Sequence, residues 1–414
     1  MLVSDLPASP FDARQLGLRA LRKLPAVFAD LPEPRQHRRP KHLLTDIVVM
    51  ALLAVCGGAD SWQDIRTYAW RKRRWLKSFL ELPAGIPSRD TFRRVFSRLD
   101  CLAFQQCFVN WLAALHANTP SDANAPSADG PTAAEAHVAI DGKTLRRSFD
   151  RAAAATPLHL VQAWSTDTSL VLGQVATETK SNEITAIPRL LELLDLQHTV
   201  FTIDAAGCQK EIAAQIIAGG GDYILALKDN HPHLREDVGR HFEARHAGRL
   251  RQTDRRIVTD QKSRGRQERR EYYVTPLPKE LRGQDAWAGL QSVVQVISTI
   301  TQQGRQTNEV RYYLSSLPPV RGARIATCVR QHWGIENGLH WTLDMSFRED
   351  ESRIRHRRAQ ENFAWLRRTA LSLLKQYQQR LKHQGEKDPP SIRCLRKSAG
   401  WDDQLLANLL LGTT

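Results

Sequence analysis

The chain has 414 residues with a formal net charge of +15, and 42% of the residues are hydrophobic. This length supports two or three domains with at least one sizeable core, and the hydrophobic share excludes a disordered protein. So basic a chain is expected to bind a polyanion, either nucleic acid or an anionic membrane surface. Its basic residues are concentrated in four stretches, at 66–74, 89–98, 245–270 and 348–368.

Signals for export or for a membrane span are not found in the sequence. The longest strongly apolar run, residues 47–56, is too short to cross a bilayer, and the N-terminus does not resemble a secretory signal. The six cysteines are scattered and form no C-x-x-C pair, which argues against a zinc ribbon. We therefore expect a cytoplasmic, nucleoid-associated protein that has reduced thiols and no membrane partner.

Residues 1–116 are predicted to form a helical N-terminal domain. Helices are expected at 43–56, from Ser61 onward and from Ser88 onward, where Ser88 is a natural N-cap. The third helix has an apolar face formed by Phe92, Val95, Phe96 and Leu99. Its arginines lie largely off that face: Arg89, Arg93, Arg94 and Arg98. Short helices with a tight connection and a basic last helix resemble a helix-turn-helix, although a solvated basic face remains an equal alternative.

A predicted linker follows, and after it the apolar pattern changes from one typical of helices to one typical of strands. Residues 117–136 are rich in Ala, Pro, Ser, Asp and Asn, which is typical of a linker. Strands are then expected at 137–141, 158–165, 169–177, 199–204 and 223–228, with helices near 186–194 and 209–217. Three hairpin-linked strands followed by alternating helices and strands predict an α/β fold with a mixed five-stranded sheet. This order of elements matches an RNase H-like core.

The remainder of the chain interrupts this core and then completes it. Residues 229–318 are predicted to be a β-rich insertion, because a basic stretch is followed by two strand-like segments, SVVQVISTIT and EVRYYLSS. Long helical runs resume over 324–343 and 359–381. The catalytic core is therefore assigned to residues 137–228 and 319–381, and residues 382–414 to a C-terminal tail.

Two aspartates mark the expected site. Asp141 and Asp204 each end an apolar strand, and small polar residues follow both. Side chains at the ends of buried strands are held rigidly at the sheet edge where α/β sites form. A divalent metal would remove the repulsion between two such carboxylates. Each residue alone could equally cap a turn, but the pair in this strand order favours a metal site.

The third ligand is expected from the later helix, in QHWGIENGLHWTLD. Glu336 lies there among residues that look buried, one helical turn from His332 and from His340. We interpret Glu336 as a metal carboxylate. A zinc site built from the two histidines is less favoured, because their spacing exceeds that of H-E-x-x-H. Asp344 is a competing ligand, whereas Glu349 and Asp350 are expected to pair with Arg348, Arg353 and Arg355.

The ligand chemistry indicates the metal. Carboxylate oxygens with open coordination positions select Mg²⁺ or Mn²⁺. Two such ions suit in-line displacement at phosphorus, because one activates the nucleophile and the other stabilises the leaving oxygen. We therefore expect two ions in each active site.

Five segments now carry a resemblance. AIDGKTLRRSFD, TKSNEITAIPRLL, TIDAAGCQKEIA, YILALKDNH and RQHWGIENGLHWTLDMSFREDESRIR together resemble the H-repeat-associated (ISAs-type) family of insertion-sequence transposases, within the DDE group with an RNase H-like fold. The similarity spans about residues 30–380. It implies a catalytic triad of Asp141, Asp204 and Glu336, with a β-rich insertion before the glutamate. The chain departs from related groups at Thr342, where they carry Lys, and lacks their Tyr pattern before Glu336.

DNA contacts are expected near the predicted strand ends and around the third carboxylate. The candidates for backbone contacts are Lys143, Lys180, Asn182, Lys228, Asn230, Arg330, His332, Arg353 and Arg355. For each of these, an ordinary surface role is an even alternative. Trp333 and Trp341 could stack on a flipped base, but core packing is the favoured interpretation of both.

Together these features predict a DNA transposase. The helical domain would bind the terminal inverted repeats, and the core would cut each end and join the 3′-hydroxyl to target DNA. Two ends must be held together, so a homodimer on double-stranded DNA is expected. The alternatives are a structure-selective nuclease with the same metal site and a non-catalytic DNA-binding repressor derived from a transposase.

Overall fold

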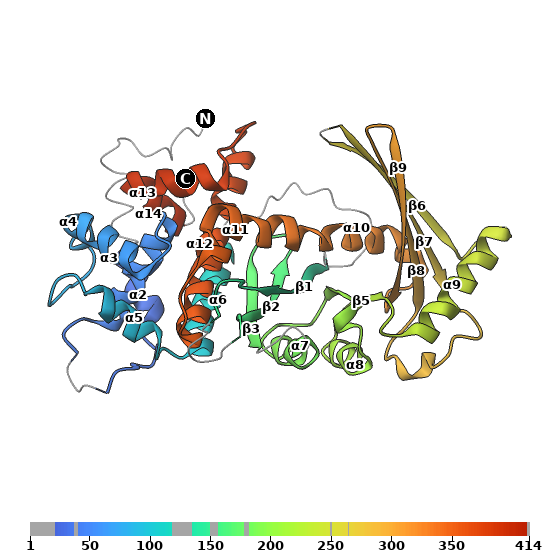
Figure 1. Ribbon diagram of the computed structural model, residues 1–414, viewed down its shortest axis with the longest axis horizontal. Coiled ribbons are helices and arrows are strands. Elements are labelled where there is room, and N and C mark those ends of the chain that lie inside the picture. Colours follow the sequence, from blue (N-terminus) through green and yellow to red (C-terminus); the bar gives the residue numbers. More distant parts are fainter. Residues whose placement is uncertain are drawn as a thin grey trace, which may run out of the picture.

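One continuous β-sheet runs through the molecule. The computed structural model describes residues 21–36, 40–117, 135–149, 156–177, 182–248, 251–263 and 265–411. Within these ranges the sheet has nine strands in the order β3-β2-β1-β4-β5-β9-β8-β7-β6, and helices cover both of its faces (Figure 1).

The first five strands are those that the apolar runs predict. They are β1 (Ala136–Thr144), β2 (His159–Ser165), β3 (Val171–Thr177), β4 (Thr199–Ile203) and β5 (Asp222–Leu227). β1 pairs antiparallel with β2 and parallel with β4, and β4 pairs parallel with β5. The predicted mixed sheet is therefore confirmed, and its central strands are buried on both faces, as apolar runs without alternation indicate.

The predicted five-stranded limit is wrong, because the β-rich region continues the same sheet. This region contains β6 (Arg255–Ser263), β7 (Arg266–Pro276), β8 (Ser292–Gln302) and β9 (Arg305–Ser315), and β9 pairs antiparallel with β5. The structure also shows a helix that the sequence did not predict, α9 (Pro232–Ala247), before β6. Sequence patterns identify strands, but tertiary contacts decide that β9 pairs with the side of β5 that β4 leaves free.

Helices pack on both sides of this sheet. On one face lie α7 (Glu183–Leu191) and α8 (Lys210–Ala218), with a core that includes Ile187, Ile212 and Phe201. On the other face lie α10 (Gly322–His332) and α12 (Arg357–His383). Between these two helices run a π-helix, η6 (Ile335–His340), then α11 (Trp341–Phe347) and η7 (Glu349–Glu351). Single-turn 3₁₀ helices elsewhere are η3 (Ala205–Gly207), η4 (Gln284–Ala286) and η5 (Pro319–Arg321).

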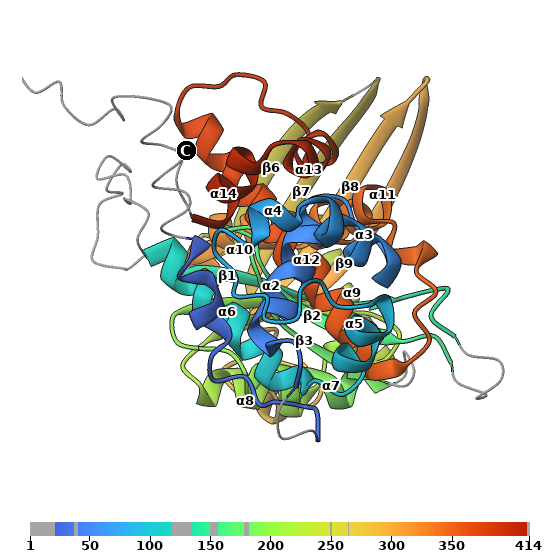
Figure 2. The ribbon, with the colours of Figure 1, turned by 90° about the vertical axis from the view of Figure 1, so that its left-hand side faces the viewer.

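The N-terminal helices and the C-terminal helices share one core. The first group comprises η1 (Leu24–Phe28), α2 (Leu44–Cys56), α3 (Trp62–Arg71), α4 (Arg73–Leu76), α5 (Arg89–Phe96) and α6 (Cys101–Ala117). The second comprises α12 with α13 (Ile392–Trp401) and α14 (Asp403–Leu411), which lie beside α2 and α3 (Figure 2). Residues 392–411, expected as part of a tail, are thus helical and packed against the body of the molecule.

Arg396 of α13 shows how closely these ends are joined. Its guanidinium donates to the carbonyl oxygens of Val55 and Ala59 and pairs with Asp60 at 2.7 Å. These hydrogen bonds join α13 to the last turn of α2 and to the loop that follows it. Among the described residues, no helix is both long and apolar enough to cross a membrane.

Candidate active site

Asp141 and Asp204 lie side by side where two parallel strands stop pairing. The β1–β4 register ends at Ile140 opposite Ile203, and each aspartate follows directly. Asp204 ends β4 as predicted and caps η3, with Oδ1 accepting the amides of Ala206 and Gly207 at 3.1 and 3.4 Å.

Asp141 differs from the expectation that it would end its strand. β1 continues from Asp141 to Thr144, held by antiparallel pairing with β2 alone. The residues Gly-Lys-Thr after Asp141 lack an apolar pattern, so the sequence suggested a strand end. Backbone pairing to β2 overrides that local signal.

Glu336 reaches the same place from a distant part of the chain. One cavity of about 310 Å³ is lined by all three predicted carboxylates, Asp141, Asp204 and Glu336. Three basic side chains also line it: Lys228 directly after β5, Arg235 of α9 and Arg311 of β9. The structure therefore brings to one cavity two side chains, Asp141 and Glu336, that are 195 positions apart in the sequence.

The local structure around Glu336 differs from the regular helix that was expected. Residues 335–340 form a π-helix, and Glu336 is exposed, whereas the sequence suggested that it was buried. Helical spacing placed Glu336 on one face with His332 and His340, but a π-helical turn contains an extra residue and rotates the following side chains. Short π-helical segments inside helices are frequent at functional sites.

The electrostatics of the cavity show an excess of negative charge. Burial and the neighbouring charge of Asp204 raise the pKa of Asp141 to about 7, and the charge of Glu336 acts in the same direction. Burial and the charge of Glu183 raise the pKa of Asp204. His340 Nδ1 lies 3.6 Å from Asp141 Oδ2, but burial holds the pKa of His340 well below its usual value, so this imidazole is neutral at pH 7.

These carboxylates suit a hard divalent cation by their chemistry. Oxygen donors with raised pKa values around one cavity are stabilised when a cation replaces their protons. Within the described ranges, however, no group of three His, Cys, Asp or Glu side chains is close enough together to hold a metal ion. A site made of all three predicted carboxylates would therefore require Glu336 to lie closer to the two aspartates. The zinc alternative receives no support, because His332 instead bonds Thr202 at 2.9 Å.

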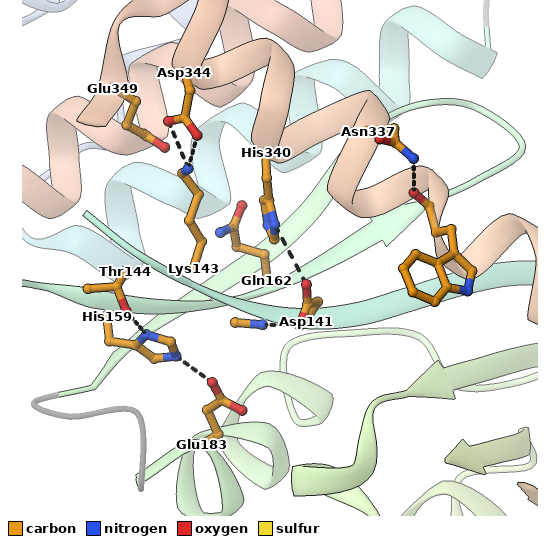
Figure 3. A network of polar contacts seen from close by, with 12 residues as sticks. Asp141, Lys143, Thr144, His159, Gln162, Glu183, Asn337, His340, Asp344 and Glu349 are labelled. Atoms are coloured by element: carbon orange, nitrogen blue, oxygen red, sulfur yellow. Dashed lines mark hydrogen bonds and ion pairs between the residues drawn. The ribbon is translucent and has the colours of Figure 1, made fainter. Parts of the chain in front are cut away.

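The competing carboxylates are engaged elsewhere. Both oxygens of Asp344 accept hydrogen bonds from the buried ammonium of Lys143, at 2.8 and 2.7 Å (Figure 3). This pair joins β1 to α11, so Lys143, an expected DNA contact, is held inside the protein. The expectation that Glu349 pairs with Arg348, Arg353 or Arg355 is wrong, because Glu349 pairs with Arg368 and both side chains are fully buried.

The other expected DNA contacts are distributed around this site. Lys228 is exposed and lines the cavity, and Asn230 donates to the Ala205 carbonyl oxygen at 2.8 Å, which supports the turn after Asp204. Asn182 is exposed directly before α7, and Lys180 lies outside the described residues. Two further candidates surround a separate hollow with Arg147: Arg353 and Arg355, both exposed.

A second, larger cavity adjoins the first. It measures about 580 Å³, lies between α10 and strands β7–β9, and shares Arg311, Trp333 and Glu336 with the carboxylate cavity. Three more arginines line it: Arg266, Arg270 and Arg330. The Arg311 guanidinium stacks 4.3 Å from the centre of the Trp333 ring. We refer to this cavity as the arginine groove.

The sequence had indicated the basic stretch but not this groove. Alternation along a strand sends every second arginine to the same face, but only the pairing of β9 with β5 brings that face beside the carboxylates. The predicted core packing of Trp341 is wrong, because its side chain is 60% exposed.

The basic helix near the N-terminus is partly as expected. α5 buries Phe92, Val95 and Phe96 and exposes Arg89, Arg93 and Arg94. The tight connection to the preceding helix is not present, since α4 and residues 77–88 separate α3 from α5. The apolar periodicity correctly predicted the helix, but it did not predict the length of the connection that precedes it.

Comparison with known proteins gives a consistent result. A family described as "Transposase DDE domain" matches residues 132–373, and one described as "DDE_Tnp_1-associated" matches residues 26–112. "H repeat-associated putative transposase YhhI" of Escherichia coli (strain K12) is 36% identical over 359 residues, covering 86% of this chain and 90% of that protein. "Putative transposase YncI" of Escherichia coli O157:H7 is 38% identical over 349 residues, covering 83% and 85% respectively. The chain therefore belongs to the H-repeat-associated insertion-sequence transposases of the DDE transposase family.

Proposed function

We propose that the protein is an active DNA transposase that cuts the ends of its insertion sequence and joins the 3′-hydroxyl ends to target DNA. The observation that carries this proposal is the convergence of Asp141, Asp204 and Glu336 on one cavity. The strand order β3-β2-β1-β4-β5, with β2 antiparallel to its neighbours, further supports an RNase H-like core.

The three carboxylates would hold Mg²⁺ or Mn²⁺. When bound, two such ions supply activation of the attacking oxygen and stabilisation of the leaving oxygen. The chain itself fixes Asp141 through the Gly142 amide, which donates to Oδ1 at 2.8 Å, and fixes Asp204 through the amides of η3. Each of these hydrogen bonds favours the ionised carboxylate, which is the form that binds a cation.

The arginine groove is the proposed path of the DNA strand that enters the site. It is continuous with the carboxylate cavity through Arg311, Trp333 and Glu336. Arginine suits a phosphate backbone because its planar fork donates two hydrogen bonds at once. Burial, and after it the positive charge of Arg270, lowers the pKa of Arg330, so a bound phosphate would relieve the repulsion between these two arginines.

The helical N-terminal region is proposed to bind the terminal inverted repeats, through the exposed arginines of α5. Joining two ends requires both to be present in one complex, so we infer a dimer on DNA. Exposed arginines at the hollow around Arg353 and Arg355 provide a further surface for phosphate contacts.

The decisive experiment is strand transfer. Purified protein is mixed with a duplex of the element's end that already has its 3′-hydroxyl exposed, together with a supercoiled plasmid and Mg²⁺. A transposase joins the duplex to the plasmid. A structure-selective nuclease would cut both DNAs without joining them, and a repressor would bind the end without cutting, so either result would refute the proposal.

A further inference from the structure

A buried acid–imidazole pair lies directly behind the proposed metal site. Glu183, the first residue of α7, accepts a hydrogen bond from His159 of β2, with 2.7 Å between Oε1 and Nε2. The two side chains are 4% and 2% exposed. The motif TKSNEI contains two of the expected DNA contacts, Lys180 and Asn182, whereas Glu183 and His159 had no predicted role.

This pair is packed against the residue that follows Asp141. A Cβ atom added at Gly142 would lie 2.3 Å from Glu183 Oε1 and 2.5 Å from His159 Nε2, which no side chain tolerates. Thr144, on the same face of β1 as Gly142, hydrogen-bonds His159 Nδ1 at 2.8 Å. The chain Thr144–His159–Glu183 therefore lies along the face of β1 opposite Lys143 and His340 (Figure 3).

Backbone pairing explains why β1 needs support at this point. Up to Ile140 the strand is held on both sides, by β2 and by β4. From Asp141 onward β4 has ended, and only β2 remains as a partner. The Gly142 peptide is thus paired with a neighbouring strand on one side only. The side chains of His159 and Glu183 pack against its face.

The Gly142 peptide in turn sets the direction of the Asp141 carboxylate. Its amide donates to Asp141 Oδ1 at 2.8 Å. We propose that His159 and Glu183 are positioning residues that hold the Gly142 peptide, and through it the Asp141 carboxylate, in the orientation that binds a divalent cation. This inference rests on the proposed metal site at Asp141 and Asp204.

The nature of the pair favours such a role over simple packing. A carboxylate and an imidazole that are this deeply buried require each other as hydrogen-bond partners. Apolar residues would fill the same space at a lower cost in desolvation free energy. Glu183 also places negative charge near both aspartates, since its charge raises the pKa of each. Outer partners of this kind orient the groups that bind a metal, and their loss costs about 10- to 100-fold in metal affinity.

The test measures Mn²⁺ binding directly, by electron paramagnetic resonance or calorimetry, on the full chain. Glu183→Gln keeps the shape of its side chain but removes the charge, and His159→Gln replaces the imidazole with a polar side chain that can still form hydrogen bonds; both changes weaken the pair. Each is expected to raise the Kd for Mn²⁺ about 10-fold or more, while binding to end DNA in EDTA stays unchanged. The double variant should be no worse than either single variant, because both act through one contact.

Two controls keep the outcomes distinct. His246→Gln makes the same substitution at a histidine that bonds Gln295 between α9 and β8, away from Gly142, and should leave the Kd for Mn²⁺ unchanged. Asp141→Asn should abolish tight Mn²⁺ binding, and if it does not, the proposed metal site itself is wrong. If Asp141→Asn abolishes binding but the Glu183 and His159 variants change only the melting temperature, the metal site stands and the positioning role is refuted.

Discussion

The two ends of the nine-stranded sheet differ in burial, pairing and charge. At the β1–β4 end, parallel strands are covered on both faces and present carboxylates whose pKa values burial raises. At the β6–β9 end, long antiparallel strands are partly exposed and carry arginines paired with nearby glutamates, as in Arg270 with Glu268 and Arg311 with Glu309.

This difference suits the two tasks that we propose for one sheet, cation binding and DNA contact. Carboxylates that must converge on a cation require a rigid, desolvated frame, and parallel strands between helix layers provide one. Arginines that contact a phosphate backbone are better placed near solvent, where the charged guanidinium loses little hydration free energy. The junction is β5 with β9, where Lys228 and Arg311 line the same cavity as the aspartates.

The largest effect is expected at the buried end, for Asp204→Asn. Loss of one of the three proposed metal-binding carboxylates should reduce Mg²⁺-dependent DNA cleavage by about 10³-fold or more, because the transition state would lose several kcal/mol of stabilisation. Binding to end DNA, measured by gel shift in EDTA, should stay within about two-fold. Cleavage at the level of the unmodified protein would show that Asp204 is not part of the site.

The loss of a buried ion pair should lower the free energy of unfolding more than the loss of exposed ion pairs on the β6–β9 strands. Arg368→Met leaves Glu349 without its partner and should lower the free energy of unfolding by about 3–5 kcal/mol. The matched change on the exposed hairpin, Arg269→Met, removes ion pairs with Asp260 and Glu271 and should cost less than about 1 kcal/mol. Urea titrations of both variants measure these values, and equal losses would contradict the contrast.

The charge on Asp141 predicts how stability depends on pH in the absence of metal. Its folded pKa of about 7 exceeds the ordinary value of 3.8, so the folded state retains a proton that the unfolded state has lost. Stability from this group is therefore highest below about pH 4 and falls as the pH rises toward 7. Asp141→Asn should raise the free energy of unfolding by about 1–4 kcal/mol at pH 8 in EDTA, and have little effect at pH 4.

The smallest effect is expected in the arginine groove. Arg330→Ala should weaken DNA binding several-fold and reduce the slope of log affinity against log salt by about 1, as expected for one lost phosphate contact. Arg240→Ala serves as a control, because Arg240 is exposed on α9 and pairs with Asp237. A salt slope that changes equally in both variants would show that the groove has no special part in binding.

Local sequence was sufficient for much of this structure. The apolar runs predicted the first five strands because a strand buried on both faces must be apolar throughout. The position of Asp204 followed from the end of such a run. The apolar face of α5 followed from helical periodicity in the same way.

Other features required contacts between distant residues. The Lys143–Asp344 and Glu349–Arg368 pairs join residues whose separations in sequence say nothing about their proximity. The exposure of Glu336 depends on a π-helical turn, which no simple periodicity predicts. No local pattern indicated that His159 and Glu183 are partners, because they are 24 residues apart in sequence and meet only where both pack against Gly142.

The sequence by itself determined the class of fold, the strand that ends at Asp204, the carboxylates that converge on one cavity and the basic character of the chain. Only the tertiary structure decided that β9 joins β5, that Lys143 is paired inside the protein, and that the buried side chains of His159 and Glu183 pack against Gly142. The physical reason is that periodicity and turn signals act over a few residues. Pairing of sheet edges and burial of charge depend instead on the free energy of the whole packed molecule.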